Sequence, residues 1–228
     1  MTPVPDALLD RLRRVDTTSL VDAGPGLRVL PLDLRPVRPG SRLVGRAVTA
    51  DARQDLMSVL AGLALAGPGD VLVVAAGGDD RAVAGELFAT EAVRRGLAGI
   101  VIDGRCRDSA TLAGLDLPVF ARGVAPHAYP AQGVPVIQVP ITLGPVTVSP
   151  GEVIIGDDDG VLVADEESIM DVIDAAEAIQ AREARLRKAI AGGRSLFDAL
   201  NVDDHVAALQ AGEPSRLRFS ELDERAGS

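Results

Sequence analysis

The residues best suited to chemistry lie between Gly85 and Gly123, where a Gly-Glu-Leu triplet is followed by an Arg-Asp pair. Glu86 and Asp108 supply carboxylates, and Arg107 supplies a guanidinium group. One direct carboxylate together with water ligands is an ordinary way for a protein to hold Mg²⁺. A planar guanidinium suits a carboxylate or an enolate oxygen. These residue types therefore fit a site for a small carboxylic acid beside a divalent metal ion.

The remaining reactive side chains argue against several other mechanisms. A Schiff-base aldolase needs a lysine that is desolvated in a pocket, whereas Lys188, the only lysine, lies in a run of charges on a predicted helix. His127 and His205 are far apart and Cys106 is the only cysteine, so no familiar zinc spacing exists. A bound metal would then have oxygen ligands, which points to Mg²⁺ or Mn²⁺. Neither a Walker loop nor a G-x-G-x-x-G motif after a predicted strand is present.

Each candidate residue also has a purely structural alternative. Asp108 is placed to cap a short helix over residues 109–112. Arg107 could form a surface ion pair, and the helix dipole favours Glu86 in a first turn. Cys106 lies between two arginines that could lower the pKa of a thiol, but a nucleophile would also need a base. A small, half-buried filler is therefore the preferred interpretation of Cys106.

A strand–helix–strand unit is expected to position these residues. The apolar run Asp70–Ala76 predicts a strand with both faces covered, and the spacing of apolar residues predicts a helix over Arg81–Arg95 that Gly96 ends. A second buried strand is expected over Ala98–Ile102, followed by a turn at Asp103-Gly104. Ligands of such units tend to lie at the carboxyl ends of the strands.

The amides of Leu87 and Phe88 lie about one turn into the predicted helix. Unpaired N–H groups and the helix dipole favour an anion at such a position. The helix can thus contribute backbone donors to the same site as the side chains.

The other expected elements describe an α/β protein. Helices are predicted near the N-terminus and before the first buried strand, over Leu8–Val15 and Leu56–Ala66, with a strand at Leu43–Ala50 and a proline-rich connection at Pro25–Gly40. Short β-like runs in the later half indicate a second, more antiparallel β layer, at Val119–Phe120, Val136–Val139, Val146–Val148, Val153–Ile155 and Val161–Ala164. A long helix with one apolar face is expected over Asp165–Ala191, ended by Gly192-Gly193. The expected fold is one layered α/β domain over residues 1–228, with a βαβ core and a swivelling β/β/α-like second layer. Residues 165–228 would form a helical C-terminal extension.

Composition limits the partners. Hydrophobic residues make up 47% and aromatic residues 2% of the 228 residues, so the core must consist of small aliphatic side chains. A net charge of −10 disfavours a nucleic-acid or anionic-membrane partner. The first ten residues lack a basic region followed by an apolar run, which predicts no signal peptide and a cytoplasmic location.

The segment Gly85–Gly123 resembles the RraA-like family. This family includes 4-hydroxy-4-methyl-2-oxoglutarate and 4-carboxy-4-hydroxy-2-oxoadipate aldolases and regulators of ribonuclease E, and older annotation called its members demethylmenaquinone methyltransferases. The Gly-Glu-Leu helix followed by the DG-x-x-RD turn is the specific part. Looser matches are PGSRLVGRAVT at Pro39–Thr49, PGDVLVV at Pro68–Val74 and DDDGVLV at Asp157–Val163. The last of these resembles a calcium loop only superficially, and a turn is expected there.

The resemblance implies a role for each site residue. Asp108 would bind the metal, Arg107 would recognise pyruvate, and Glu86 would reach the metal through water. The backbone amides of Leu87 and Phe88 would hold the substrate carboxylate. The resemblance also implies a trimer or a hexamer. By a loose alignment, Glu183 would be a carboxylate that a neighbouring subunit contributes to the site.

Two positions depart from the family pattern. Arg105-Cys106 stands where small or apolar residues often precede the Arg-Asp pair, which could alter substrate choice. Leu143-Gly144-Pro145 stands where Gly-Gly is frequent, which could alter subunit packing.

The leading functional hypothesis is a class II pyruvate aldolase that uses Mg²⁺ or Mn²⁺ to cleave a 2-oxo-4-hydroxy acid. A water network near Glu86 would act as the base, and oxaloacetate decarboxylation is expected as a side activity because it yields the same enolate. The alternative is a non-catalytic regulator of ribonuclease E-type activity. A third interpretation, methyl transfer from S-adenosylmethionine, lacks a glycine-rich cofactor loop.

Overall fold

The computed structural model describes residues 5–77 and 80–219. The chain divides into two compact units, Met1–Ala176 and Glu177–Ser228. The first unit contains the large β-sheet, and the described residues of the second form helices and one isolated antiparallel bridge between Leu200 and Phe219. Whether residues 165–228 form an extension of a single domain stays a prediction.

The first unit is built on one mixed sheet. Its main strands, in spatial order, are β1 (Arg28–Val29), β12 (Gly160–Ala164), β11 (Val153–Asp157), β3 (Leu43–Asp51), β4 (Asp70–Ala75), β6 (Gly99–Cys106), β7 (Val119–Val124) and β2 (Arg35–Pro36). Two short strands pair with the ends of central strands, β5 (Ala82–Ala84) with the end of β6 and β8 (Val136–Ile137) with the end of β3. The central strands β3, β4, β6 and β7 are parallel, whereas the flanking pairs are antiparallel.

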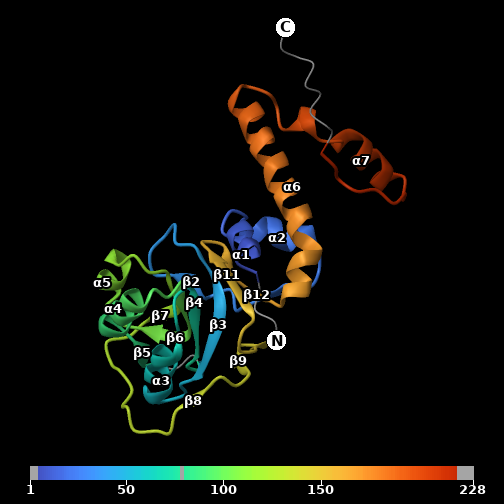
Figure 1. Cartoon of the computed structure of the whole chain (residues 1–228). Helices are drawn as coiled ribbons and strands as arrows, with labels where there is room; N and C mark the ends of the chain where they lie inside the picture. The colour runs from blue at the N-terminus through green and yellow to red at the C-terminus, as the bar shows by residue number, and fades with distance from the viewer. Residues whose placement is uncertain (1–4, 78–79, 220–228) are drawn as a thin grey trace. The chain divides into compact units, whose positions relative to one another are not determined.

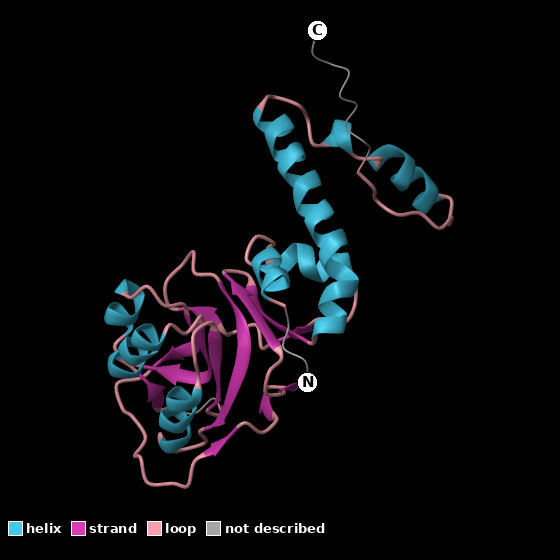
Figure 2. Cartoon of the chain, viewed as in Figure 1, coloured by secondary structure: helices cyan, strands magenta, loops and turns pink. Residues whose placement is uncertain are grey.

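Helices cover one face of this sheet. Alternate strand residues such as Val48, Leu72 and Ile100 pack in one core cluster with the helices α3 (Met57–Leu65), α4 (Glu86–Arg95) and α5 (Ser109–Gly114). A second core cluster, which includes Val44 and Ile155, packs against α1 (Asp6–Leu12), α2 (Thr17–Ala23) and the first turns of α6 (Glu166–Ala191). Figures 1 and 2 show these helices beside the strands, with α3, α4 and α5 gathered together.

The opposite face carries the intervening residues. Val71, Val73 and Val101 pack there with a two-stranded sheet formed by β9 (Ile141–Leu143) and β10 (Val146–Val148). Both faces of β4 are therefore covered, as the continuous apolar run predicted, and Val71 to Val74 are fully buried.

The α/β fold class is confirmed, but the second β layer is smaller than expected. Only Val146–Val148 among the predicted later strands lies in a separate sheet. β11 and β12 instead join the large sheet, because β11 pairs with β3 from Leu43 to Arg46. The Asp157–Asp159 turn is confirmed, since it joins these two strands and Asp157 accepts hydrogen bonds from the backbone N–H of Thr17 at 2.8 Å and from its hydroxyl at 2.6 Å.

Two expectations within the βαβ unit are wrong. Ala82–Ala84 form β5 and the helix begins only at Glu86, because β5 pairs in parallel with the end of β6. Asp103-Gly104 does not turn the chain, since β6 continues to Cys106 with an irregularity in its pairing to β7. Gly96 ends α4 as predicted, at φ 74° in the left-handed region.

The second unit contains the remainder of α6, a 3₁₀ turn at Phe197–Ala199 and α7 (Val202–Gln210). Leu186 and Ala199 are its buried hydrophobic side chains among the residues described. Arg182 lies over the Phe219 ring at 5.4 Å from its centroid, and the side-chain oxygen of Asn201 accepts from the backbone N–H of Arg218 at 2.6 Å. Among the described helices, none has the length and apolar character needed to cross a bilayer.

Candidate functional site

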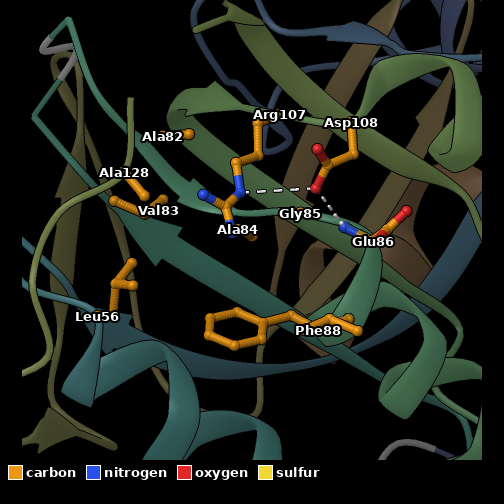
Figure 3. Close-up of a pocket in the computed structure, with 11 residues that line it drawn as sticks. Leu56, Ala82, Val83, Ala84, Gly85, Glu86, Phe88, Arg107, Asp108 and Ala128 are labelled. Carbon is orange, nitrogen blue, oxygen red and sulfur yellow. Dashed lines mark hydrogen bonds and ion pairs between the residues drawn. The ribbon is translucent and has the colours of Figure 1, made fainter. Parts of the chain in front are cut away.

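A pocket of about 150 Å³ lies where β5, the start of α4 and the end of β6 meet. Arg107 and Asp108 follow β6, and Glu86, Leu87 and Phe88 form the first turn of α4. Figure 3 shows Arg107 and Asp108 on one side of the pocket, with the Phe88 ring and Leu56 on the opposite side. The tertiary structure thus brings together all five residues that the sequence singled out.

Asp108 is held in an uncommon backbone conformation, at φ 58° and ψ 38°. Aspartate tolerates this left-handed region better than most residues, and such conformations cluster at functional sites. Asp108 occupies the position before α5, yet its side chain makes no capping hydrogen bond to that helix. Its Oδ2 instead accepts from the backbone N–H of Glu86 at 3.1 Å and lies 3.5 Å from Nε of Arg107. The helix-capping alternative for Asp108 is therefore wrong.

Gly85 makes the approach of Asp108 possible. Its backbone is extended at φ −158°, so the glycine is not required by conformation. A Cβ at this position would lie 2.5 Å from Oδ2 of Asp108 and 2.8 Å from Cγ of Arg107, which is closer than real Cβ contacts. Gly85 was part of the quoted motif but was not predicted as a site residue, because only its tertiary neighbours reveal why a side chain is excluded.

Because α4 begins at Glu86 and not at Arg81, the backbone N–H groups of Leu87 and Phe88 lie in the first turn of the helix. Leu87 and Phe88 are the second and third residues of the helix, and amides of the first turn have no intrahelical acceptor. The Gly85 cap contributes no side-chain hydrogen bond. Leu87 is 71% exposed and the Glu86 side chain is also exposed, so solvent and small anions can reach this helix end.

The site offers one side chain placed to hold a cation directly. Within residues 5–77 and 80–219, no cluster of three or more His, Cys, Asp or Glu side chains is placed to share a metal ion. The Asp108 side chain is 35% exposed and Glu86 also lines the pocket, so two carboxylates border it. Mg²⁺ keeps several waters and is often bound through only one or two carboxylates, and this donor set fits such an ion.

Cys106 is a buried filler beside the site. Its side chain is fully buried and its Sγ lies 3.6 Å from the carbonyl oxygen of Gly123. Burial raises the pKa of the thiol to about 11, so the thiolate is not formed near neutral pH. The interpretation of Cys106 as a filler is confirmed, although it is fully buried where half-burial was expected.

Other candidate residues lie outside this pocket. Lys188 is exposed on α6, as expected for a solvated face. His205 contacts the Ser215 hydroxyl through Nδ1 at 2.9 Å. Glu183 belongs to the second unit and its role stays a prediction.

The pocket also has walls that the sequence did not indicate. Leu56 and Ala128 line it together with Ala82, Val83 and Ala84 of β5. Their residue types are ordinary for a hydrophobic core, so no local signal distinguishes them. The pairing of β5 with β6 places residues 82–84 beside Arg107, and backbone hydrogen bonds of residues 127–130 with Ala82 and Leu56 bring Ala128 and Leu56 to the same pocket.

The fold and the pocket together define an α/β protein with a pocket, lined by Arg107, Asp108 and the start of α4, at the carboxyl ends of its parallel strands. The model of the RraA-like family, described as Aldolase/RraA, matches residues 17–163. This chain belongs to the RraA-like family.

Individual relatives and structural neighbours carry different descriptions. A protein of Halalkalibacterium halodurans, provisionally named 4-hydroxy-4-methyl-2-oxoglutarate aldolase, is 36% identical over 184 residues, which cover 80% of this chain and 88% of that protein. The crystal structure of RraAS2 from Streptomyces coelicolor, described as an unusual member of the RNase ES inhibitor RraA protein family, has 30% identity and a TM-score of 0.70, covering 82% of this chain and 98% of the other. An uncharacterized protein from Pseudomonas syringae pv. tomato has 29% identity and a TM-score of 0.75, with coverage of 87% and 98%.

Proposed function

We propose that this protein is a divalent-metal-dependent class II pyruvate aldolase that cleaves a 2-oxo-4-hydroxy acid. The observation that carries the proposal is the shared pocket of Arg107, Asp108 and the first-turn amides of α4. A guanidinium, a carboxylate and free backbone donors are together suited to a 2-oxo acid, which presents a carboxylate beside a carbonyl group. The name of the Halalkalibacterium relative supports the same class of reaction.

The chain's own residues position the substrate and stabilise charge. The amides of Leu87 and Phe88 bind the substrate carboxylate, and Asp108 holds Mg²⁺ or Mn²⁺. When bound, this ion supplies Lewis-acid polarisation of the 2-oxo group. Water near the Glu86 carboxylate takes the proton of the 4-hydroxyl group as the bond between C3 and C4 breaks. The electron pair passes into the enolate of pyruvate, which Arg107 stabilises until C3 takes up a proton.

Oxaloacetate decarboxylation would follow the same course. Loss of CO₂ leaves the electron pair on C3 of the same enolate, so Arg107 and the helix amides perform the same task. The 4-hydroxyl proton is not involved, and Glu86 is therefore less important for this reaction than for aldol cleavage.

A regulatory function is the second candidate. The Streptomyces coelicolor neighbour is described as an unusual member of a family of RNase ES inhibitors. In this protein Gly85 leaves room for the Asp108 carboxylate beside Arg107 at the start of α4. This arrangement favours the enzyme.

We also propose that the enzyme is a homotrimer or a hexamer. In a cyclic trimer each interface joins two different patches, so one subunit can lend a residue to the next. Glu183 is the residue proposed for this role, as a further carboxylate near a neighbour's Asp108.

The deciding experiment is pyruvate release from oxaloacetate, measured with and without Mg²⁺ or Mn²⁺. We expect activity that depends on the metal and disappears in EDTA. Undiminished activity in the chelator, or trapping of pyruvate on Lys188 by borohydride, would refute the metal mechanism. Failure to release pyruvate from either oxaloacetate or 4-hydroxy-4-methyl-2-oxoglutarate would favour the regulator.

A further inference from the structure

The pocket at the start of α4 has two ends of different character. One end contains the first turn of α4 and the carboxylates of Glu86 and Asp108. The other end contains Ala82 and Ala128, and Figure 3 shows the Arg107 guanidinium between the two ends. A 2-oxo acid bound by Arg107 and the α4 amides therefore extends its carbon-4 end toward Ala82 and Ala128.

Arg81 lies immediately beyond this second end of the pocket. It directly precedes β5, its side chain is exposed, and its Nη1 donates to the carbonyl oxygen of Ala128 at 3.4 Å. The neighbouring segment is fixed, since the N–H of Ala82 donates to the carbonyl of His127 at 2.8 Å and the N–H of Tyr129 donates to the carbonyl of Ala82 at 3.2 Å. Because Ala82 and Ala128 both line the pocket, the Arg81 guanidinium is at its rim.

The contacts of the Arg81 guanidinium do not neutralise its charge. The hydrogen bond to Ala128 is long, and the guanidinium carbon lies 5.8 Å from the centroid of the Tyr129 ring, near the outer limit of a cation–π contact. A carbonyl group and an aromatic ring are both neutral partners. An arginine side chain has several N–H donors in a planar fork, and such a fork binds a carboxylate through two donors at once.

The separation of Arg81 and Arg107 suits a molecule of about five carbon atoms. The N–H of Arg107 donates to the carbonyl of Ala84 at 3.0 Å, which puts Arg107 beside Ala84. Ala84 is three residues from Arg81, so the backbones of the two arginines are about 10 Å apart along this extended segment. The two ends of a five-carbon chain are about 5 Å apart, because each C–C bond is about 1.5 Å long. The flexible side chains of the two arginines can span the difference.

A second substrate carboxylate is disfavoured at the α4 end. Glu86 and Asp108 already place negative charge there, and like charges repel one another. The Halalkalibacterium relative is named for 4-hydroxy-4-methyl-2-oxoglutarate, a molecule with a carboxylate at each end of its chain. In this protein the second carboxylate of such a molecule meets a cation only when it points toward Arg81.

We infer that Arg81 is a specificity-determining residue that receives the second carboxylate of a 4-hydroxy-2-oxo dicarboxylic acid. This inference rests on the proposed aldolase function. The guanidinium exchanges its long hydrogen bond to Ala128 for a charge-assisted contact with the carboxylate attached to carbon 4. This carboxylate takes no part in breaking the C3–C4 bond, so the contact is equally strong in the bound substrate and in the transition state. Arg81 therefore lowers KM and leaves kcat unchanged.

The first test measures binding of two acids that cannot be cleaved. 2-Oxoglutarate and 2-oxopentanoate have the same chain length and no 4-hydroxyl group, and they differ only in a terminal carboxylate or methyl group. Calorimetry in the presence of Mn²⁺ should show that the wild-type protein binds 2-oxoglutarate about tenfold more tightly, the low end for a hydrogen bond to a charged group because Arg81 is exposed. Arg81→Met keeps the aliphatic stem, removes the charge and should abolish this preference. Equal affinities in the wild type, or an unchanged preference in Arg81→Met, would overturn the inference.

The second test measures pyruvate release from 4-hydroxy-2-oxoglutarate and 4-hydroxy-2-oxopentanoate. In Arg81→Met the KM of the dicarboxylic acid should rise about tenfold, while its kcat and both constants of the monocarboxylic acid stay within about twofold. Arg81→Lys should be intermediate, because an ammonium group keeps the charge but lacks the planar fork. An equal loss of kcat for both acids would show that Arg81 only maintains the structure, and would overturn the inference.

Arg53→Met is the matched control. Arg53 is another arginine just beyond the carboxyl end of a central strand, its side chain is 61% exposed, and it does not line the pocket. This variant should keep the wild-type preference for the dicarboxylic acids. An equal loss of preference in Arg53→Met would assign the effect to the overall charge at this end of the sheet and would overturn the role of Arg81.

The outcomes distinguish this inference from the proposed function. If oxaloacetate and 4-hydroxy-2-oxoglutarate release pyruvate but Arg81→Met keeps the dicarboxylate preference, the aldolase proposal stands and the inference about Arg81 is overturned. If none of the acids releases pyruvate while Arg81→Met still weakens the binding of 2-oxoglutarate, the aldolase proposal falls and the carboxylate-binding role of Arg81 stands.

Discussion

Gly85→Ala is a direct test of the site, because it adds one methyl group at a position where the Asp108 carboxylate leaves no room for a side chain. The new Cβ would lie 2.5 Å from Oδ2 of Asp108 and 2.8 Å from Cγ of Arg107. The backbone is extended, so alanine adopts the conformation without strain. The methyl group can therefore be accommodated only if the two site side chains move away.

The displacement needed is about 1 Å, because ordinary carbon contacts begin near 3.4 Å. A misplacement of about 1 Å in a catalytic group can lower activity about 100-fold. The hydrogen bond from Glu86 N–H to Asp108 at 3.1 Å would be lost or weakened in the same movement. We therefore expect kcat/KM for oxaloacetate to fall about 100-fold, with a weaker affinity for Mn²⁺.

The assay couples pyruvate to lactate dehydrogenase and follows NADH, while calorimetry reports Mn²⁺ binding. Gly114→Ala is the matched control, since Gly114 ends α5 and a Cβ there meets nothing within 4 Å. The control should retain full activity and both variants should unfold cooperatively on heating. Wild-type kinetics and metal affinity in Gly85→Ala would refute the proposed geometry around Asp108.

Three further predictions concern the thiol, the two central side chains and the assembly. Because burial raises the pKa of Cys106 to about 11, a thiol reagent at pH 8 should leave the native protein unlabelled. The same reagent should modify one thiol per chain in guanidinium chloride. Rapid labelling of the native protein would contradict the buried position of Cys106. The neutral thiol is favoured by folding, so its contribution to stability is complete below about pH 9 and is lost as the pH rises toward 11. Asp108→Ala should lose activity together with Mn²⁺ affinity, whereas Arg107→Ala should lose activity with Mn²⁺ still bound, and wild-type kinetics in Arg107→Ala would eliminate its enolate role. Light scattering should show a trimer or hexamer at micromolar concentration, and mixing inactive Asp108→Ala and Glu183→Ala subunits should restore activity; no recovery after demonstrated exchange would place Glu183 outside the site.

The sequence by itself determined the elements that depend on local pattern. The run Asp70–Ala76 indicated a strand covered on both faces, and β4 has that environment because helices pack on one face and the β9–β10 pair on the other. Gly96 ends α4 because glycine adopts the left-handed conformation without a steric penalty. Glu86, Arg107 and Asp108 were singled out by their types, their spacing and the family resemblance, and they do border one pocket.

Only the tertiary structure decided how these side chains face one another. The apolar spacing over Arg81–Arg95 suits a helix, yet residues 82–84 form β5 because their backbone pairs with the end of β6. Because of this pairing α4 begins at Glu86, and the Glu86 N–H donates to the carboxylate of Asp108, 22 residues away in the chain. Hydrogen bonds of residues 127–130 with Ala82 and Leu56 likewise bring Leu56 and Ala128, two half-buried residues, to the same pocket. Pairing between distant strands depends on partners outside any local window, so periodicity predicted the helix and the strands but not the pocket between them.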